Sequence, residues 1–193
     1  MLSLGLTGPT SDVLEMVLLA LAFIGAIWLI ATLVSWLRTS PWKGKKAMHK
    51  TIEDFQSLLD QASPELAGVS ESDRESKSAP GKWSKKEILG HLIDSASNNH
   101  QRFVRAQLSA ELKLPAYEQE AWVKTQDYQN EAWENLVQLW KSYNAHLLHI
   151  ISSISENALR NYCFIGSNEP VTLEFLIEDY IRHMKHHLEQ ILE

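Results

Sequence analysis

The chain has 193 residues, of which 45% are hydrophobic and 22% are charged, and its formal net charge is -6. This size fits one folded domain with an appendage but not two full domains. The charge is uneven, because residues 1–47 carry +2 and residues 48–193 carry -8. An acidic domain is poorly suited to neutralising the phosphates of nucleic acid, so we do not expect this domain to bind nucleic acid. A single cysteine, Cys163, excludes an intrachain disulfide framework.

The N-terminal part contains a long apolar run. From Met16 to Val34 it reads MVLLALAFIGAIWLIATLV, without a charged residue. A helix over residues 13–37 would be about 37 Å long, enough to cross the roughly 30 Å hydrocarbon core of a membrane. The run is longer than the apolar region of a signal peptide, and it lacks the basic start and the small-residue cleavage site. The pattern therefore predicts one transmembrane helix at residues 13–37.

Five basic residues follow this predicted helix on its C-terminal side, namely Arg38, Lys43, Lys45, Lys46 and Lys50. By the positive-inside rule they place the domain in the cytoplasm and the short N-terminus outside, with a single pass through the inner (cytoplasmic) membrane. Residues 38–47 are then predicted to be a basic juxtamembrane linker. The alternative is that translation starts at Met48, which would make the protein cytoplasmic.

The rest of the chain reads as a series of amphipathic helices. Apolar residues at helical spacing predict a first helix over residues 48–62. A long connecting loop, rich in Ser, Pro and Gly, is expected over residues 63–82. The sequence from Ser84 to Glu87 is a capping box, which predicts a sharp start for a second helix that ends near Ala110.

Pro115 marks a loop after the second helix, because proline interrupts helices. A third helix is predicted over about residues 131–154, followed by a short turn or helix at residues 156–159. An irregular segment then leads into a last helix, from Thr172 to the C-terminus. No segment shows the alternation of a strand. Four helices of three or more turns predict an all-α four-helix bundle over residues 48–193.

Three histidines on two of these helices are candidate metal ligands. His183 and His187 are four residues apart, so their Cβ atoms lie about 6 Å apart on one face of the last helix. Neutral imidazole nitrogens are suitable ligands for divalent metals near neutral pH. His91 borders the apolar stripe of the second helix and can face the same bundle interior. The three histidines therefore predict a metal site, whereas His186 points about 100° away from His187.

Other residues compete with this set or could assist it. His146 and His149 lie three apart on the third helix and could join or replace a ligand, but we interpret them as exterior or pocket-rim residues. The alternative for all the histidines is a structural one, as surface groups or satisfied core groups. Five polar residues are candidates for orienting water or substrate, namely Asp94, Asn98, Arg102, Tyr143 and Asn144.

Two segments resemble motifs of the DinB/YfiT-like family. The first is GKWSKKEILGHLIDSASNNHQRFVRAQ, where a Trp-Ser helix start leads into a His followed by Leu-x-Asp. The second is VTLEFLIEDYIRHMKHHLEQI, with a HxxxH followed by Leu-x-Gln-Ile. The resemblance covers about residues 48–193. It implies a four-helix bundle, often dimeric, that holds one divalent ion, zinc, nickel or a similar metal, through His91, His183 and His187.

The family resemblance also implies an activity, either metal-dependent hydrolysis or the transfer of low-molecular-weight thiols, on a small-molecule substrate. Three protein nitrogens leave open positions on a metal, as in catalytic rather than structural zinc sites. Such a metal acidifies bound water or activates a thiolate. The alternative is a non-enzymatic metal-binding or sensing domain that is tethered to the membrane.

Overall fold

The computed structural model describes residues 41–193, with side chains described from Met48 onward. Contacts divide the chain into Met1–Gly44 and Lys45–Glu193, and the architecture below is that of the second unit. The predicted transmembrane helix at residues 13–37 lies outside the described residues. Within the described range, none of the helices has the length and apolar character needed to cross a membrane.

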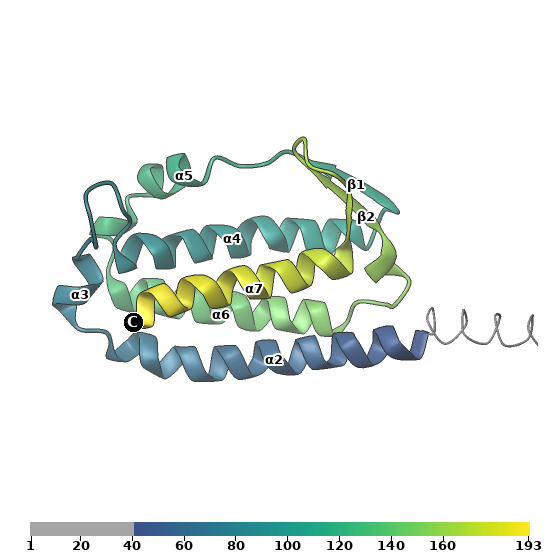
Figure 1. The fold of residues 1–193 in the computed structure, drawn as a ribbon, viewed down its shortest axis with the longest axis horizontal. Coiled ribbons are helices and arrows are strands. Elements are labelled where there is room, and N and C mark those ends of the chain that lie inside the picture. The colour runs from purple at the N-terminus through teal and green to yellow at the C-terminus, as the bar shows by residue number, and fades with distance from the viewer. Residues whose placement is uncertain (1–40) are drawn as a thin grey trace, which may run out of the picture. The chain divides into compact units, whose positions relative to one another are not determined.

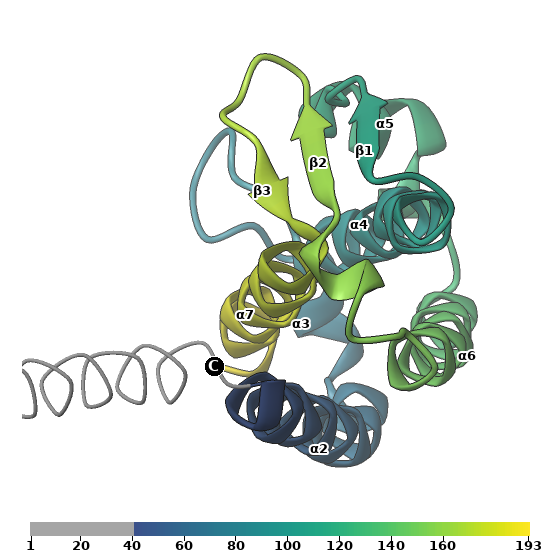
Figure 2. The same ribbon diagram turned by 90° about the vertical axis from the view of Figure 1, so that its right-hand side faces the viewer.

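Four long helices form the bundle that the hydrophobic pattern predicts (Figure 1). They are α2 (Pro41–Gly68), α4 (Lys85–Ala106), α6 (Trp133–Ser152) and α7 (Leu173–Leu192). In the end-on view, α2 and α4 lie on opposite sides of the bundle, with α6 and α7 between them (Figure 2). The predicted four-helix bundle is therefore confirmed.

Side chains at the helix starts explain where α4 and α7 begin. Ser84 Oγ accepts a hydrogen bond from the Glu87 N–H, and Glu87 Oε2 accepts one from the Ser84 N–H at 2.8 Å, so the predicted capping box is present. Thr172 Oγ1 likewise accepts from the Phe175 N–H and caps α7. Both caps fix the start of a helix that carries candidate ligands.

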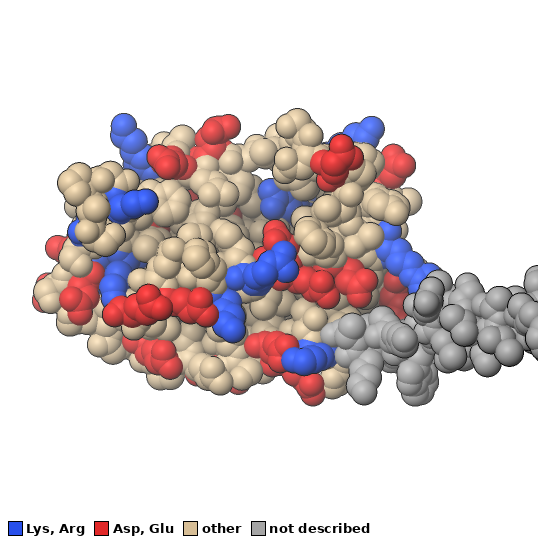
Figure 3. Space-filling view, in the orientation of Figure 1, with Lys and Arg blue, Asp and Glu red and all other residues tan. Residues whose placement is uncertain are grey.

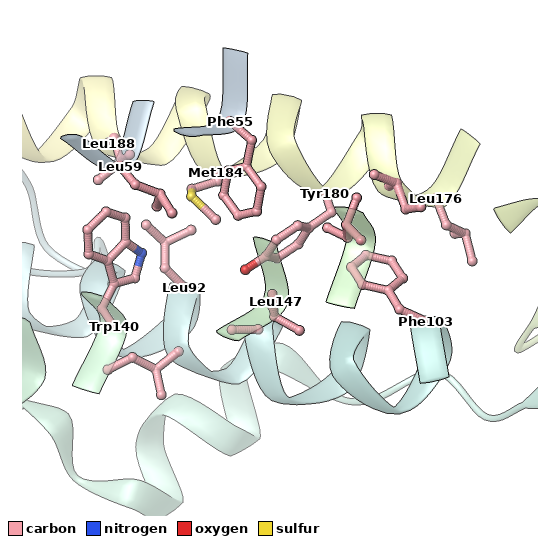
Figure 4. Packing of buried hydrophobic residues seen from close by; sticks show 14 of the residues in the cluster. Phe55, Leu59, Leu92, Phe103, Trp140, Leu147, Leu176, Tyr180, Met184 and Leu188 are labelled. Atoms are coloured by element: carbon pink, nitrogen blue, oxygen red, sulfur yellow. The ribbon is translucent and has the colours of Figure 1, made fainter. Parts of the chain in front are cut away.

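The core lies between the four helices, and each helix contributes a large side chain to it (Figure 4). Phe55, Phe103 and Trp140 are fully buried, and Tyr180 is 2% exposed. The Tyr180 ring packs edge-on against Phe55 at 6.0 Å and against Phe103 at 5.7 Å between ring centroids. Burial of each such side chain contributes about 1.5–3 kcal/mol, and this packing holds α7 in register with α4.

Helix α2 is longer than predicted at both ends. It begins at Pro41, so residues 41–47 of the predicted linker are helical, and it continues beyond residue 62 to Gly68. The short helix α3 (Glu71–Glu75) occupies more of the segment expected to be a loop. The predicted loop over residues 63–82 is therefore wrong over its first half.

Tertiary contacts explain why α2 continues through Pro64. Proline removes a helix hydrogen bond and crowds the preceding turn, which disfavours a helix interior. Ser63 Oγ donates to the Leu59 carbonyl at 2.6 Å. Beyond the proline, Leu66 is fully buried, and its carbonyl accepts a hydrogen bond from Trp133 Nε1 at 2.9 Å. These contacts stabilise a turn that local sequence disfavours.

The prediction that the chain contains no strand is wrong. Strands β1 (Glu111–Leu114), β2 (Tyr162–Ile165) and β3 (Val171–Thr172) form one sheet in that order. β1 is parallel to β2, and β2 is antiparallel to β3. Strands of two to four residues are too short to show an alternating pattern in sequence.

The segment between β1 and α6 also holds more structure than predicted. Helix α5 (Gln119–Gln126) and the 3-10 helix η1 (Tyr128–Asn130) lie there. A second 3-10 helix, η2 (Ala158–Arg160), lies close to the predicted turn at residues 156–159. The sheet and α5 lie on the same side of α4 (Figures 1 and 2), so together they cover the outer face of the bundle there.

Candidate metal centre

The fold brings the three predicted ligands together. His91 lies in the second turn of α4 and is fully buried, whereas His183 and His187 lie one turn apart on α7 and are half-buried. The Nε2 atoms of His91 and His183 are 3.1 Å apart. One ring nitrogen from each of the three histidines lies within 4.8 Å of the others. In the part of the chain that the structure describes, this is the one such cluster of His, Cys, Asp or Glu.

This arrangement fits a divalent ion. Two imidazole nitrogens bound to one tetrahedral zinc ion would lie about 3.4 Å apart, close to the separation of the His91 and His183 nitrogens. His91 Nδ1 is buried and has no hydrogen-bond partner among the described residues. The polar contact of the His91 ring within the described chain is therefore the one between its Nε2 atom and His183.

Burial keeps the imidazoles neutral. It is the main cause that lowers the pKa of His91 to about 3, with repulsion from the other two histidines as a smaller cause. Burial first, and then proximity to His187, lowers the pKa of His183 to about 4. The pKa of His187 is also lowered, mainly by burial. All three rings therefore offer lone pairs to a metal ion at neutral pH.

Neighbouring side chains contact two of the candidate ligands. The Trp83 ring lies 5.0 Å from the His91 ring, at an interplanar angle of 39°. His187 Nδ1 lies 2.8 Å from Gln190 Oε1, an acceptor, so Nδ1 carries the proton and Nε2 is left for an ion. The Gln190 amide also contacts His186 Nε2, at 3.0 Å. His186 is exposed and outside the cluster, as predicted.

A cavity of about 280 Å³ adjoins the cluster, and His183 is part of its wall. Its walls come from α4, from the connection between β1 and α5, from the β2–β3 hairpin and from α7. Much of this lining is polar, including Ser95, Asn99, Arg102, Tyr117, Asn168 and Asp179. Figure 3 shows the surface hollowed beneath the connection between β1 and α5. The cavity is large enough for a small molecule.

The structure places Asp94 and Asn98 on α4 but outside the cavity wall. Asp94 Oδ1 accepts hydrogen bonds from Tyr128, at 2.7 Å, and from Gln126, whereas Oδ2 is buried without a partner among the described residues. Burial raises the pKa of Asp94, and these two hydrogen bonds oppose the rise. Asn98 donates to the Asp94 carbonyl at 2.9 Å, so its side chain is bonded to the helix.

Of the other three polar candidates, Arg102 lines the cavity and the two on α6 do not. The Tyr143 hydroxyl lies 3.2 Å from His100 Nδ1. Asn144 is fully buried; it donates to the Trp140 carbonyl at 2.7 Å and accepts a short hydrogen bond from the Tyr180 hydroxyl. The structure therefore brings Arg102 to the candidate site and places Asn144 in the core.

His146 and His149 do not join the cluster formed by His91, His183 and His187. His146 packs against His100, with ring centroids 5.2 Å apart, and His149 stacks on His146. Sequence reasoning missed Tyr117 and Asn168, because both lie in segments expected to be loops and no local pattern marks them. Trp83 is notable in the sequence for its place before the capping box, but its contact with His91 depends on the fold.

Comparison with known proteins supports a family assignment. The model of the DinB superfamily matches residues 47–191. YfiT from Bacillus subtilis (strain 168), described as a probable metal-dependent hydrolase, is 23% identical over 148 residues, which cover 75% of this chain and 80% of YfiT. A relative from Geobacillus thermodenitrificans (strain NG80-2), described in the same way, is 25% identical over 145 residues, covering 73% of this chain and 80% of the relative.

Solved structures share the fold. The structure of YfiT is reported to have an unusual four-helix bundle topology. It matches this chain with a TM-score of 0.68 and 19% identity, over 76% of this chain and 85% of YfiT. The mycothiol-dependent maleylpyruvate isomerase matches with a TM-score of 0.61 and 13% identity over 73% of this chain and 59% of the isomerase. Because the family model matches residues 47–191, which are most of this chain, the chain belongs to the DinB superfamily.

Proposed function

We propose that this chain is a metal-dependent enzyme that acts on a small molecule, either by hydrolysis or by transfer of a low-molecular-weight thiol. One observation carries the proposal: three neutral histidines converge within 4.8 Å, and one of them, His183, also lines a cavity of about 280 Å³. Three protein ligands leave at least one coordination position for water or substrate, which is typical of catalytic sites.

The donor set favours zinc or nickel, because imidazole nitrogens suit both ions. A bound ion of this kind would supply Lewis acidity that lowers the pKa of a water or thiol in the open position. The chain's own residues perform the remaining tasks. The histidines stay neutral through burial, Gln190 fixes the proton of His187 on Nδ1, and the polar cavity wall contacts the substrate.

The relatives support both branches of the proposal. YfiT is described as a probable metal-dependent hydrolase, and the isomerase that shares the fold depends on a thiol. The test uses the full chain in a mild detergent, stripped with a chelator and then reloaded with Zn²⁺ or Ni²⁺. The samples are offered panels of esters and amides, and thiols paired with electrophiles. We expect turnover from the loaded protein, none from the stripped protein, and none from His183→Ala.

The matched control is His186→Ala, which removes an exposed neighbouring imidazole and should keep both metal and turnover. A loaded chain that holds one ion and turns over none of these substrates would contradict the enzymatic proposal. That result would favour a non-enzymatic metal-binding or sensing domain.

We also propose that residues 13–37 tether the domain to the cytoplasmic side of the inner membrane, because the uncharged run is followed by basic residues. Membrane fractions should retain the full chain after an alkaline carbonate wash, and a chain started at Met48 should be released. Release of both would contradict the tether. The homodimer that the family resemblance implies stays a prediction, to be checked by light scattering.

A further inference from the structure

The cavity beside the histidines contains one strong positive charge. Among the described residues that line this cavity, Arg102 is the one lysine or arginine, and the Arg102 side chain is half-buried. Its one hydrogen bond within the described chain joins Nη1 to Asn99 Oδ1 at 3.2 Å, and no described carboxylate forms an ion pair with it. A guanidinium has five N–H donors and stays charged at neutral pH, so most donors of Arg102 are unpaired in the chain itself.

The other polar groups of the wall form no ion pair with this charge. Asp179, the carboxylate of the wall, attracts Arg102 electrostatically, but it forms its ion pair with Arg182, through Oδ1 at 2.6 Å. Tyr117 makes no hydrogen bond to another described residue. Burial raises the pKa of Tyr117 to about 12, so its hydroxyl is a neutral donor near pH 7. The Arg102 end of the cavity therefore presents guanidinium N–H donors that no described carboxylate holds in an ion pair.

Helix geometry separates these donors from the histidine cluster. From His91 to Arg102 the axis of α4 rises about 16 Å. Side chains on a helix lean toward its N-terminus. The hydrogen bond to Asn99 also directs the Arg102 guanidinium toward the N-terminus of α4, so the guanidinium lies roughly 10 Å from the histidine cluster.

We propose that Arg102 is the anion-binding residue of this cavity, and that the substrate is a small molecule with a metal-binding group at one end and a carboxylate at the other, roughly 10 Å away. The inference rests on the proposed metal-dependent function. A planar guanidinium pairs with a carboxylate through two parallel hydrogen bonds. The Tyr117 hydroxyl supplies a further donor. A half-buried charge without an ion pair is costly, so such a ligand satisfies guanidinium donors that the described chain leaves unpaired.

Matched thiols test the inference by binding alone. The full chain is loaded with Co²⁺ and titrated with 6-mercaptohexanoate, with 6-mercaptohexanol and with the short acid 3-mercaptopropionate. The absorbance change on thiolate ligation reports binding. We expect the long acid to bind at least about tenfold more tightly than the alcohol, since a charge-assisted hydrogen bond contributes about 1.5–3 kcal/mol. The short acid should lack this advantage, because its carboxylate does not reach Arg102.

Three variants assign the preference to one side chain. Arg102→Gln should bring the acid-to-alcohol ratio close to one, and Arg102→Lys should keep part of the preference. Arg105→Gln removes the same charge from an exposed position on the same helix and should keep the full ratio. Circular dichroism and Co²⁺ titration check that each variant is folded and loaded.

Two results would overturn the inference with the metal site intact: equal affinity for the long acid and the alcohol in the unaltered chain, or an unchanged ratio in folded Arg102→Gln. The first comparison needs no variant. If Co²⁺ binds but neither thiol perturbs its spectrum, this inference fails while the hydrolytic branch of the proposed function stands. If no Co²⁺ binds, the proposed metal-dependent function fails and this inference fails with it.

Discussion

The ring of Tyr128 lies directly against the backbone of Gly90: a Cβ built on Gly90 would stand 2.1 Å from Tyr128 Cδ2. Gly90 immediately precedes the candidate ligand His91, and the Tyr128 hydroxyl donates to Asp94 on the same helix. The close approach therefore fixes the chain after α5 against the part of α4 that carries His91, a candidate metal ligand.

Gly90→Ala should destabilise the protein and weaken metal binding. Alanine is favoured over glycine within a helix by about 1 kcal/mol, but the Tyr128 ring is 6% exposed and has little room to move. Overpacking of this kind costs about 1–3 kcal/mol, measured by urea denaturation. Gly68→Ala is the control, since nothing lies within 4 Å of a Cβ at that position. Equal stability of the two variants would refute the contact.

Tyr128→Phe should destabilise the fold by about 1–3 kcal/mol, because it removes a donor to the buried Asp94 carboxylate. The pKa of Asp94, already raised by burial, should rise further. The comparison variant is Tyr143→Phe. The Tyr143 hydroxyl forms its hydrogen bond within the described chain with the half-buried His100, so its loss should cost less. Chemical denaturation of both variants gives the difference. A larger loss in Tyr143→Phe would contradict this account.

Asn144→Ala should reduce stability and leave metal binding in place. Asn144 lies in the core and accepts the hydrogen bond of the Tyr180 hydroxyl, so its removal leaves a buried donor unpaired at a cost of about 1–3 kcal/mol. Thermal unfolding and metal titration on the same sample separate the two effects. Loss of metal from a variant that remains folded at the assay temperature would instead give Asn144 a role in the site.

The metal-free protein should lose stability as the pH falls below about 6.5. The pKa values of His91 and His183 are about 3 and about 4 in the folded chain, and near 6.5 in an unfolded one. Between these limits the unfolded chain binds protons that the folded chain does not, so the free energy of unfolding decreases with falling pH. Above about pH 6.5 these groups contribute no slope.

Thermal unfolding of chelator-treated protein, between about pH 7.5 and pH 5, measures this slope. His91→Gln should flatten it, because it removes the histidine whose pKa is lowered to about 3. A slope that is the same in His91→Gln and in the unaltered chain would show that His91 does not titrate as its burial requires.

The histidine set was predictable because its signals are local. The spacing of His183 and His187 places two ligands on one helix face without reference to the rest of the chain. The capping box from Ser84 to Glu87 starts the helix that carries His91, and the apolar stripe of that helix turns the ligand inward. The resemblance to the two family motifs then assigns the histidines of both helices to one site.

The cavity and the role of Asp94 were not predictable, because they depend on long-range contacts. β1 pairs with β2 through residues as distant as Glu111 and Tyr162, and strands this short leave no pattern. Asp94 looks like a catalytic carboxylate in the sequence, yet Tyr128 and Gln126, from another part of the chain, bond to its Oδ1 atom. Arg102 differs from other helix-surface arginines only through what lies around it.

Elemental analysis of the full chain, purified without chelators, tests the metal centre most directly. We predict one divalent ion per chain in the unaltered protein and in His186→Ala, and almost none in His91→Ala or His183→Ala when each is folded by circular dichroism. Equal metal content in the unaltered chain and His91→Ala, whether zero or one, would contradict a site formed by His91, His183 and His187.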